Sequence, residues 1–190
     1  MDKHEALNKL ADKSVDILEV ANIFNTFLDD IEIESSVAMN LSVRTSVYDR
    51  ELGKSDIMQD LLIKLSNSKD MGVRWAVAKN PHTPVDILVK LSTDSVNLVR
   101  ALVATNPNTP VEVLVPFFSD EKIVRDGLSG NPNTPLKFLN ILSDDSDKMV
   151  RLRVAENPSS SREILEKLSN DTEKDVQKAA TIQLNNRGLS

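Results

Sequence analysis

Residues 80–84 read Asn-Pro-His-Thr-Pro, and this stretch recurs along the chain. It returns as Asn-Pro-Asn-Thr-Pro at 106–110 and 131–135, and as Asn-Pro-Ser-Ser-Ser at 157–161. Successive copies begin 26, 25 and 26 residues apart. A constant period of this length indicates a repeat protein, in which each copy is one structural element of an array.

Two further motifs keep the same period. A Val-Arg pair, whose Arg lies six residues before each Asn, occurs at 73–74, 99–100, 124–125 and 150–151. An apolar pair occurs at 87–88, 113–114, 138–139 and 164–165. Three motifs in one register support a shared three-dimensional unit much more strongly than one motif does.

Each repeat is predicted to contain two helices. Thr83, Thr109 and Thr134 suit the N-cap of the first helix, with the following Pro at the first helical position. The second helix carries the Val-Arg pair and must end at the next Asn, because the residue before a proline avoids the α region. Neither helix buries its apolar face alone, so the repeats are expected to stack into one continuous core.

The repeats are expected at 55–79, 80–105, 106–130, 131–156 and 157–184, which together form a repeat array over residues 55–184. Residues 1–54 carry weaker echoes of the motifs, such as Val-Ala-Met-Asn at 37–40, and are interpreted as a diverged, acidic N-terminal capping unit. Residues 185–190 are expected to form a C-terminal tail.

The Asn-Pro-x-Thr-Pro motif, with its apolar pairs and Val-Arg-x-x-Val-Ala, resembles the leucine-rich repeat variant (LRV) family, which is related to HEAT and armadillo arrays. The resemblance covers about residues 55–184 and implies a right-handed solenoid of alternating α and 3₁₀ helices. The predicted fold class is therefore an all-α, right-handed α-solenoid superhelix of about five to six two-helix repeats of 25–26 residues. Some members carry a cysteine cluster that binds a 4Fe–4S centre; this chain has no cysteine, so no cofactor is expected.

The charge is unevenly distributed. The net charge is −6, and residues 1–40 account for all of it with nine acidic and three basic residues. Nucleic-acid binding needs clustered Lys and Arg, so this distribution argues against it. No targeting segment and no apolar run of membrane-spanning length is seen, and a cytoplasmic location is expected.

Catalytic motifs are missing from the sequence. It contains no cysteine and two histidines, which excludes cysteine nucleophiles, zinc fingers and histidine-rich metal sites. No nucleophile elbow, glycine-rich phosphate loop or His-Glu-x-x-His motif occurs. His82 is interpreted as a turn residue because Asn or Ser fills its position in the other repeats. The sequence therefore predicts a protein that is not an enzyme.

Four acidic residues, Asp29, Asp30, Glu32 and Glu34, form the sharpest charge feature. They are candidates for receiving a basic partner protein. The alternative is a solvated helix terminus.

The repeated arginines are Arg74, Arg100, Arg125 and Arg151. One Arg per repeat could bind phosphate or carboxylate groups, as in HEAT-like DNA glycosylases. The alternative, which we favour, is structural: each Arg pairs with the Asp five or six residues earlier (Asp94, Asp120, Asp145) or with a neighbouring carbonyl.

Three aromatic residues are further candidates for partner binding. Trp75 is the one tryptophan and is either a binding hot spot or packed against the capping unit. Phe117 and Phe118 follow Pro116, which should kink its helix and expose an aromatic patch, unless the irregularity is simple drift.

These observations favour a monomeric, non-enzymatic protein-binding repeat protein, an adaptor or an inhibitor such as a bacterial immunity protein against a basic toxin. One alternative is a HEAT-like nucleic-acid-binding protein or DNA glycosylase that uses the Arg residues. Another is a structural module that dimerises through its ends.

Overall fold

The computed structural model describes residues 1–46 and 49–188, and within these residues it contains helices and no strand. In chain order the elements are α1 (Lys3–Ala11), α2 (Ile17–Thr26), α3 (Ile31–Ser42), α4 (Arg50–Gly53), α5 (Asp56–Leu65), α6 (Met71–Lys79), α7 (Val85–Leu91), α8 (Asn97–Thr105), α9 (Val111–Leu114), the 3₁₀ helix η2 (Val115–Ser119), α10 (Lys122–Gly130), α11 (Leu136–Leu142), α12 (Lys148–Glu156), α13 (Arg162–Leu168) and α14 (Lys174–Asn186).

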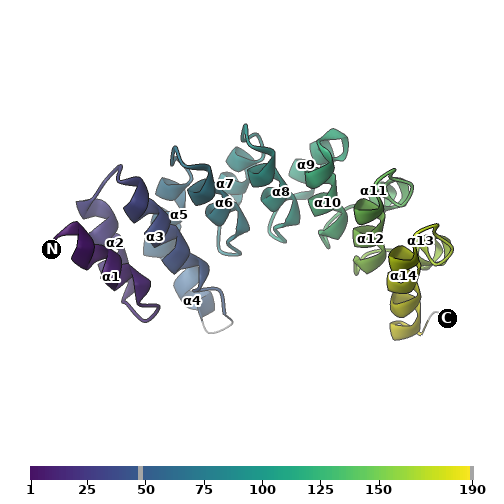
Figure 1. The fold of residues 1–190 in the computed structure, drawn as a ribbon, viewed down its shortest axis with the longest axis horizontal. Coiled ribbons are helices and arrows are strands. Elements are labelled where there is room, and N and C mark those ends of the chain that lie inside the picture. The colour runs from purple at the N-terminus through teal and green to yellow at the C-terminus, as the bar shows by residue number, and fades with distance from the viewer. Residues whose placement is uncertain (47–48, 189–190) are drawn as a thin grey trace. The chain divides into compact units, whose positions relative to one another are not determined.

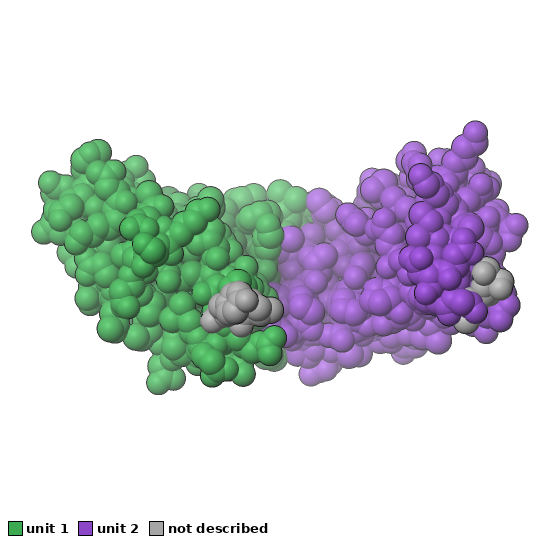
Figure 2. Space-filling model, turned by 90° about the horizontal axis from the view of Figure 1, so that it is seen from below, with its two compact units in different colours: residues 1–99 green, residues 100–190 purple. Residues whose placement is uncertain are grey.

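The chain divides into two compact units, residues 1–99 (unit 1) and residues 100–190 (unit 2), coloured separately in Figure 2. In each unit the helices stack side by side in two rows, as in an α-solenoid (Figure 1). In unit 1, α1 packs on α3 and α3 packs on α6, while α2 packs on α5. In unit 2, α10 packs on α12 and α12 packs on α14. The all-α repeat fold predicted from the sequence is confirmed.

The periodic apolar residues build the core. Leu88, Leu114, Leu139 and Leu165 are the second members of the repeated apolar pairs, and all four are fully buried. The Val of each Val-Arg pair is buried in the second helix of its repeat. Burial of a Leu or Val side chain contributes about 1.5–3 kcal/mol. The apolar residues of the repeated motifs therefore hold the helices together.

The loop threonines act differently from the prediction. The Thr83 hydroxyl donates to the Val77 carbonyl at 2.6 Å, and the equivalent bond runs from Thr109 to Val103. The helix that follows begins after the proline, with no side-chain cap at α7 or α9. The predicted N-cap is wrong, because the buried hydroxyl donates to a carbonyl at the end of the preceding helix instead.

The Asn that opens each loop links neighbouring repeats. Asn131 is fully buried; its side-chain N–H groups donate to the Ala104 and Asn106 carbonyls at 2.7 and 2.9 Å, and its Oδ1 accepts from the Asn133 backbone N–H. Asn157 forms the same bonds one repeat further on. We call these side chains the Asn ladder; they bond carbonyls at the end of the second helix one repeat earlier and so hold neighbouring repeats together.

Both ends of the chain continue this arrangement. Asn40 is buried and donates to the Leu10 and Asp12 carbonyls, as Asn131 does to Ala104 and Asn106. The pair α2–α3 is therefore a true repeat, and α1 supplies the helix on which it stacks. At the other end, Arg187 donates to the Ser160 and Asn157 carbonyls, so the packed region extends past residue 184 and the tail expected at 185–190 begins later.

The repeat at 106–130 is irregular at two points. Its first helix changes at Val115 from α-helix to 3₁₀-helix, next to Pro116, which lacks the N–H that an α-helix needs. Its second helix carries Gly127, where a Cβ atom would lie 2.6 Å from the Ala101 carbonyl oxygen. Glycine lets α10 approach α8 this closely. The described second helices of the array are α-helices, so the alternating 3₁₀ helices implied by the LRV resemblance do not occur there.

Candidate partner-binding site

The repeated arginines form bidentate ion pairs between neighbouring repeats. The Nε and Nη2 atoms of Arg151 donate to the two carboxylate oxygens of Asp171 at 2.7 and 2.9 Å. The same pattern joins Arg74 to Asp94, Arg100 to Asp120 and Arg125 to Asp145. We call these four pairs the Arg–Asp ladder.

The carboxylate predicted for each Arg was wrong, because the partner Asp lies 20 residues later and not five or six residues earlier. The earlier residue contributes its backbone carbonyl instead: the remaining nitrogen, Nη1, donates from Arg125 to Asp120 and from Arg151 to Asp145. Arg125 and Arg151 therefore each contact the turn of their own repeat and the turn of the next one.

These contacts leave the guanidinium groups little capacity for a ligand. The side chains of Arg74, Arg100, Arg125 and Arg151 are mostly buried. The bond from Arg151 lowers the pKa of the Asp171 carboxyl, and the bond from Arg100 does the same for Asp120. A phosphate would have to displace a carboxylate that is already bidentate, so this geometry does not favour nucleic-acid binding.

The acidic run is partly occupied by contacts within the chain. Asp30 caps the N-terminus of α3, and Lys3 Nζ lies 2.8 Å from both the Asp30 and Glu32 carboxylates. The hydrogen bond from Lys3 lowers the pKa of Asp30. Asp29 is exposed and takes a left-handed backbone conformation, with φ of 63°, in the turn that joins α2 to α3.

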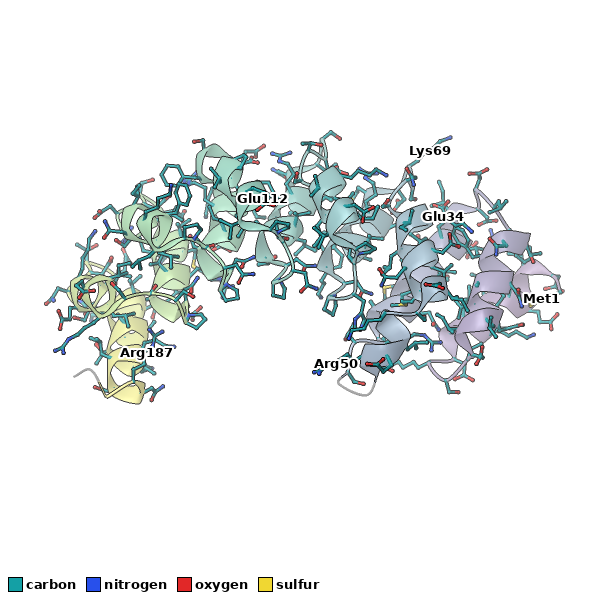
Figure 3. The ribbon with its side chains drawn as sticks, turned by 180° about the vertical axis from the view of Figure 1, so that it is seen from behind. Met1, Glu34, Arg50, Lys69, Glu112 and Arg187 are labelled. Atoms are coloured by element: carbon teal, nitrogen blue, oxygen red, sulfur yellow. The ribbon has the colours of Figure 1, made fainter. Side chains whose placement is uncertain are left out.

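The Glu34 carboxylate contacts the next repeat. It accepts a hydrogen bond of 2.5 Å from the Ser68 hydroxyl, which lies in the turn between α5 and α6. Figure 3 labels Glu34 and, in that turn, Lys69. Lys3 forms ion pairs with two of the four carboxylates, Asp30 and Glu32, so the four acidic residues and Lys3 together keep a net negative charge.

Trp75 lines a groove between α3 and α6 in unit 1. The groove has a volume of about 340 Å³, and its floor and walls are formed by Met39, Ser42, Thr45, Trp75, Ala76, Lys79, Asn80 and Pro81. Trp75 is 36% exposed and Met39 is 66% exposed. The Lys79 ammonium lies 5.1 Å from the centre of the Trp75 ring, a cation–π contact. Trp75 stands out in the sequence as its one tryptophan, whereas Met39 and Lys79, which lie one position before the ladder residues Asn40 and Asn80, do not.

The two phenylalanines have different environments. Phe117 is only 3% exposed and belongs to the core, so its assignment to a partner-binding patch is corrected. The 3₁₀ turn after Pro116 rotates it inward. Phe118 is half-buried and packs on Phe138 with ring centres 5.2 Å apart. It keeps one face at the surface, where it lines a pocket with Ile141.

His82 lies in the loop before α7. Its backbone N–H donates to Asn80 Oδ1, as the equivalent Asn133 donates to Asn131. Its ring packs against Gly53 so closely that a Cβ atom there would lie 2.3 Å from it. These contacts are those of a turn and packing residue.

The stacked helix pairs and the two ladders define an α-helical repeat protein. No protein-family model matches the sequence, and no curated protein matches it. Among solved structures, the chain is similar to one described as a leucine-rich repeat variant with a novel repetitive structural motif. The two share 21% sequence identity with a TM-score of 0.49, over 94% of this chain and 80% of that one.

Among residues 1–46 and 49–188, no three His, Asp or Glu side chains are grouped as a metal ion requires. Within the same residues, no helix combines the length and the apolar character needed to cross a bilayer.

Proposed function

We propose that this chain is a non-enzymatic repeat protein that binds another protein, and that the Trp75 groove is a principal contact. The observation that carries the proposal is the exposure of Trp75 and Met39 in one groove on α3 and α6. Tryptophan is enriched at the energetic centres of interfaces, and methionine adapts its shape to a bound surface.

A groove at the equivalent position in unit 2 provides a comparison. Between α12 and α14, Lys178 occupies the position of Trp75 and Glu156 occupies the position of Met39. Stacking of these helices therefore tolerates charged residues at both positions. Packing alone gives no reason for the apolar pair in unit 1, and partner binding does.

The charge distribution supports a basic partner. The net charge of −6 resides in residues 1–40, which include Asp29, Asp30, Glu32 and Glu34. Such a cluster accelerates the encounter with a positively charged protein. An adaptor, or an inhibitor such as an immunity protein that masks a basic toxin, fits these properties, and we propose that it acts as a monomer in the cytoplasm.

Affinity capture from the native cell lysate with mass spectrometry tests the proposal. We expect the wild-type chain to recover a basic protein. The amount recovered by W75A should be lower by a factor of about ten or more, as expected for a hot spot. L18A, which removes an exposed apolar side chain on α2 outside the groove, is the control and should recover it fully.

The variant D29N/D30N/E32Q/E34Q separates the two contacts. It should slow association and reduce the dependence of binding on salt. Equal recovery by W75A and the wild-type chain would reject the groove. Recovery of nucleic acid in place of a protein, unaffected by these substitutions, would favour the Arg-based alternative.

A further inference from the structure

A three-residue motif, Lys-Leu-Ser, ends the first helix of several repeats. It occurs at 64–66, 90–92 and 167–169, whereas 141–143 reads Ile-Leu-Ser and 116–118 reads Pro-Phe-Phe. The lysine of the motif reaches back to the preceding repeat. Lys90 Nζ donates to Ser66 Oγ at 3.1 Å, and Lys167 Nζ donates to Ser143 Oγ at 2.9 Å. A Lys–Ser bridge thus joins neighbouring repeats in both units.

At one junction in unit 2 the bridge is replaced by an apolar pair. Where repeats 106–130 and 131–156 meet, Ile141 occupies the lysine position and Phe118 occupies the serine position. Both line a pocket of about 350 Å³, which we call the Phe118–Ile141 pocket. Ile141 is 51% exposed, so it makes little contact of its own with the core.

The next junction, between repeats 131–156 and 157–184, has a pocket at the equivalent position that is lined mostly by polar residues. There Lys167 and Ser143 line a volume of about 430 Å³, beside the ladder pair Arg151 and Asp171. The Arg–Asp ladder passes through both pockets, so the stacking geometry is shared. Because the array stacks with either pair, the exchange of a hydrogen-bonded bridge for exposed apolar surface points to a ligand.

The rim of the pocket indicates the charge of that ligand. Its charged lining residues are Asp120, Arg125, Asp144 and Asp145. Arg125 is held by both Asp145 oxygens, and the carboxylate of Asp144 is the most exposed of the three. Lys167 bonds Asp144 from the neighbouring pocket. An apolar floor beside an exposed carboxylate is complementary to an apolar side chain that has a cation next to it.

We propose that the Phe118–Ile141 pocket binds a segment of a basic partner protein in which a leucine-like side chain is flanked by Lys or Arg. This inference rests on the proposed protein-binding function and adds the chemistry of the partner. The apolar side chain covers Ile141 and the exposed face of Phe118, and the flanking cation contacts Asp144.

Three synthetic peptides test the proposal by titration into the full-length, ¹⁵N-labelled chain, followed by amide chemical shifts. They are Gly-Ser-Lys-Leu-Lys-Ser-Gly, its Ser-for-Leu version and its Glu-for-Lys version. We expect the first to shift the amides of 117–119 and 141–145. The other two should bind about tenfold more weakly or worse, since each lacks one of the two complementary groups.

Two variants locate the effect. F118S/I141K introduces the Lys and Ser that form the bridge at the next junction, so it should fold normally and lose the peptide-induced shifts. L136K adds the same positive charge at an exposed apolar position on the same helix, outside the pocket, and should keep them.

Several results would overturn the proposal. They are equal binding of the three peptides, equal loss of binding in L136K and F118S/I141K, or no shift with millimolar peptide. Shifts at these amides that depend on protein concentration without peptide would identify a second copy as the occupant. The lysate capture separates the two ideas: full recovery by F118S/I141K rejects this pocket alone, whereas no protein recovered by the wild-type chain rejects the proposed function.

Discussion

Removing one member of the Asn ladder should destabilise the chain strongly. Asn131 is 0% exposed and makes three hydrogen bonds, to the Ala104 and Asn106 carbonyls and from the Asn133 N–H. Each contributes about 1 kcal/mol net, and the two carbonyls stay buried in N131A. The free energy of unfolding should therefore fall by about 3 kcal/mol, which lowers Tm by about 6–12 °C for a chain of this size.

The assay is urea unfolding followed by circular dichroism at 222 nm, with N133A as the matched control. Asn133 belongs to the same loop but is exposed and donates one side-chain hydrogen bond, to the Pro107 carbonyl. N133A should cost about 1 kcal/mol or less. A loss in N131A no greater than the loss in N133A would refute the claim that the Asn ladder links the repeats.

N131D sharpens the test, because it keeps the shape and removes the donors. Its carboxylate would face two carbonyl oxygens in a buried site, so its pKa should rise above the unfolded value of about 3.9. An acid with a raised folded pKa destabilises above its unfolded pKa and is relieved as the pH falls. The deficit of N131D relative to the wild-type chain should shrink from pH 7 to pH 4, and a constant deficit would contradict this reasoning.

Three other predictions follow from the packing and the Arg–Asp ladder. G127A should destabilise the chain by more than about 1 kcal/mol, because its Cβ would lie 2.6 Å from a carbonyl oxygen, whereas G130A meets only ordinary contacts and should be neutral or stabilising in thermal melts. R151K should cost about 1–2 kcal/mol in urea unfolding, since lysine cannot form the bidentate bond to Asp171. The lowered pKa of Asp171 stabilises the fold above its unfolded pKa of about 3.9, so the urea midpoint should fall as the pH drops from 6 to 3, and D171N should flatten that decline.

The sequence predicted the features that depend on local pattern. The helix pairs and the buried apolar faces follow from residues within one repeat, and the structure confirms both. The sequence also indicates that Asn40 corresponds to Asn80, because Val-Ala-Met-Asn at 37–40 matches Val-Ala-Lys-Asn at 77–80. These signals need only the helical spacing and the restriction that proline places on its preceding residue.

Contacts between repeats were harder to predict, because a periodic sequence offers several partners at once. Asp120 lies five residues before Arg125 and 20 residues after Arg100, and only the stacking shows that its carboxylate bonds Arg100. Thr83 suited an N-cap by its place before Pro84, yet its hydroxyl turns back to the preceding helix. Spacing alone does not decide such choices between equivalent neighbours.

For the candidate sites too, the sequence identifies unusual residues and the structure shows their surroundings. Trp75 was noticed as a rare residue, and the structure adds the groove around it. Phe117 and Phe118 were indistinguishable in sequence, and the 3₁₀ turn decides that one is buried. The sequence shows that Ile141 replaces the lysine of the Lys-Leu-Ser motif. Only the structure shows that Lys90 and Lys167 use this position to form a bridge to the preceding repeat.

Amide hydrogen exchange of the full chain, with and without the captured partner protein, is the most direct test of partner binding through the Trp75 groove. We predict slower exchange in α3 and α6, where Met39 and Trp75 line the groove, and a smaller effect or none in W75A. Unchanged exchange in both helices while the partner is bound would contradict it.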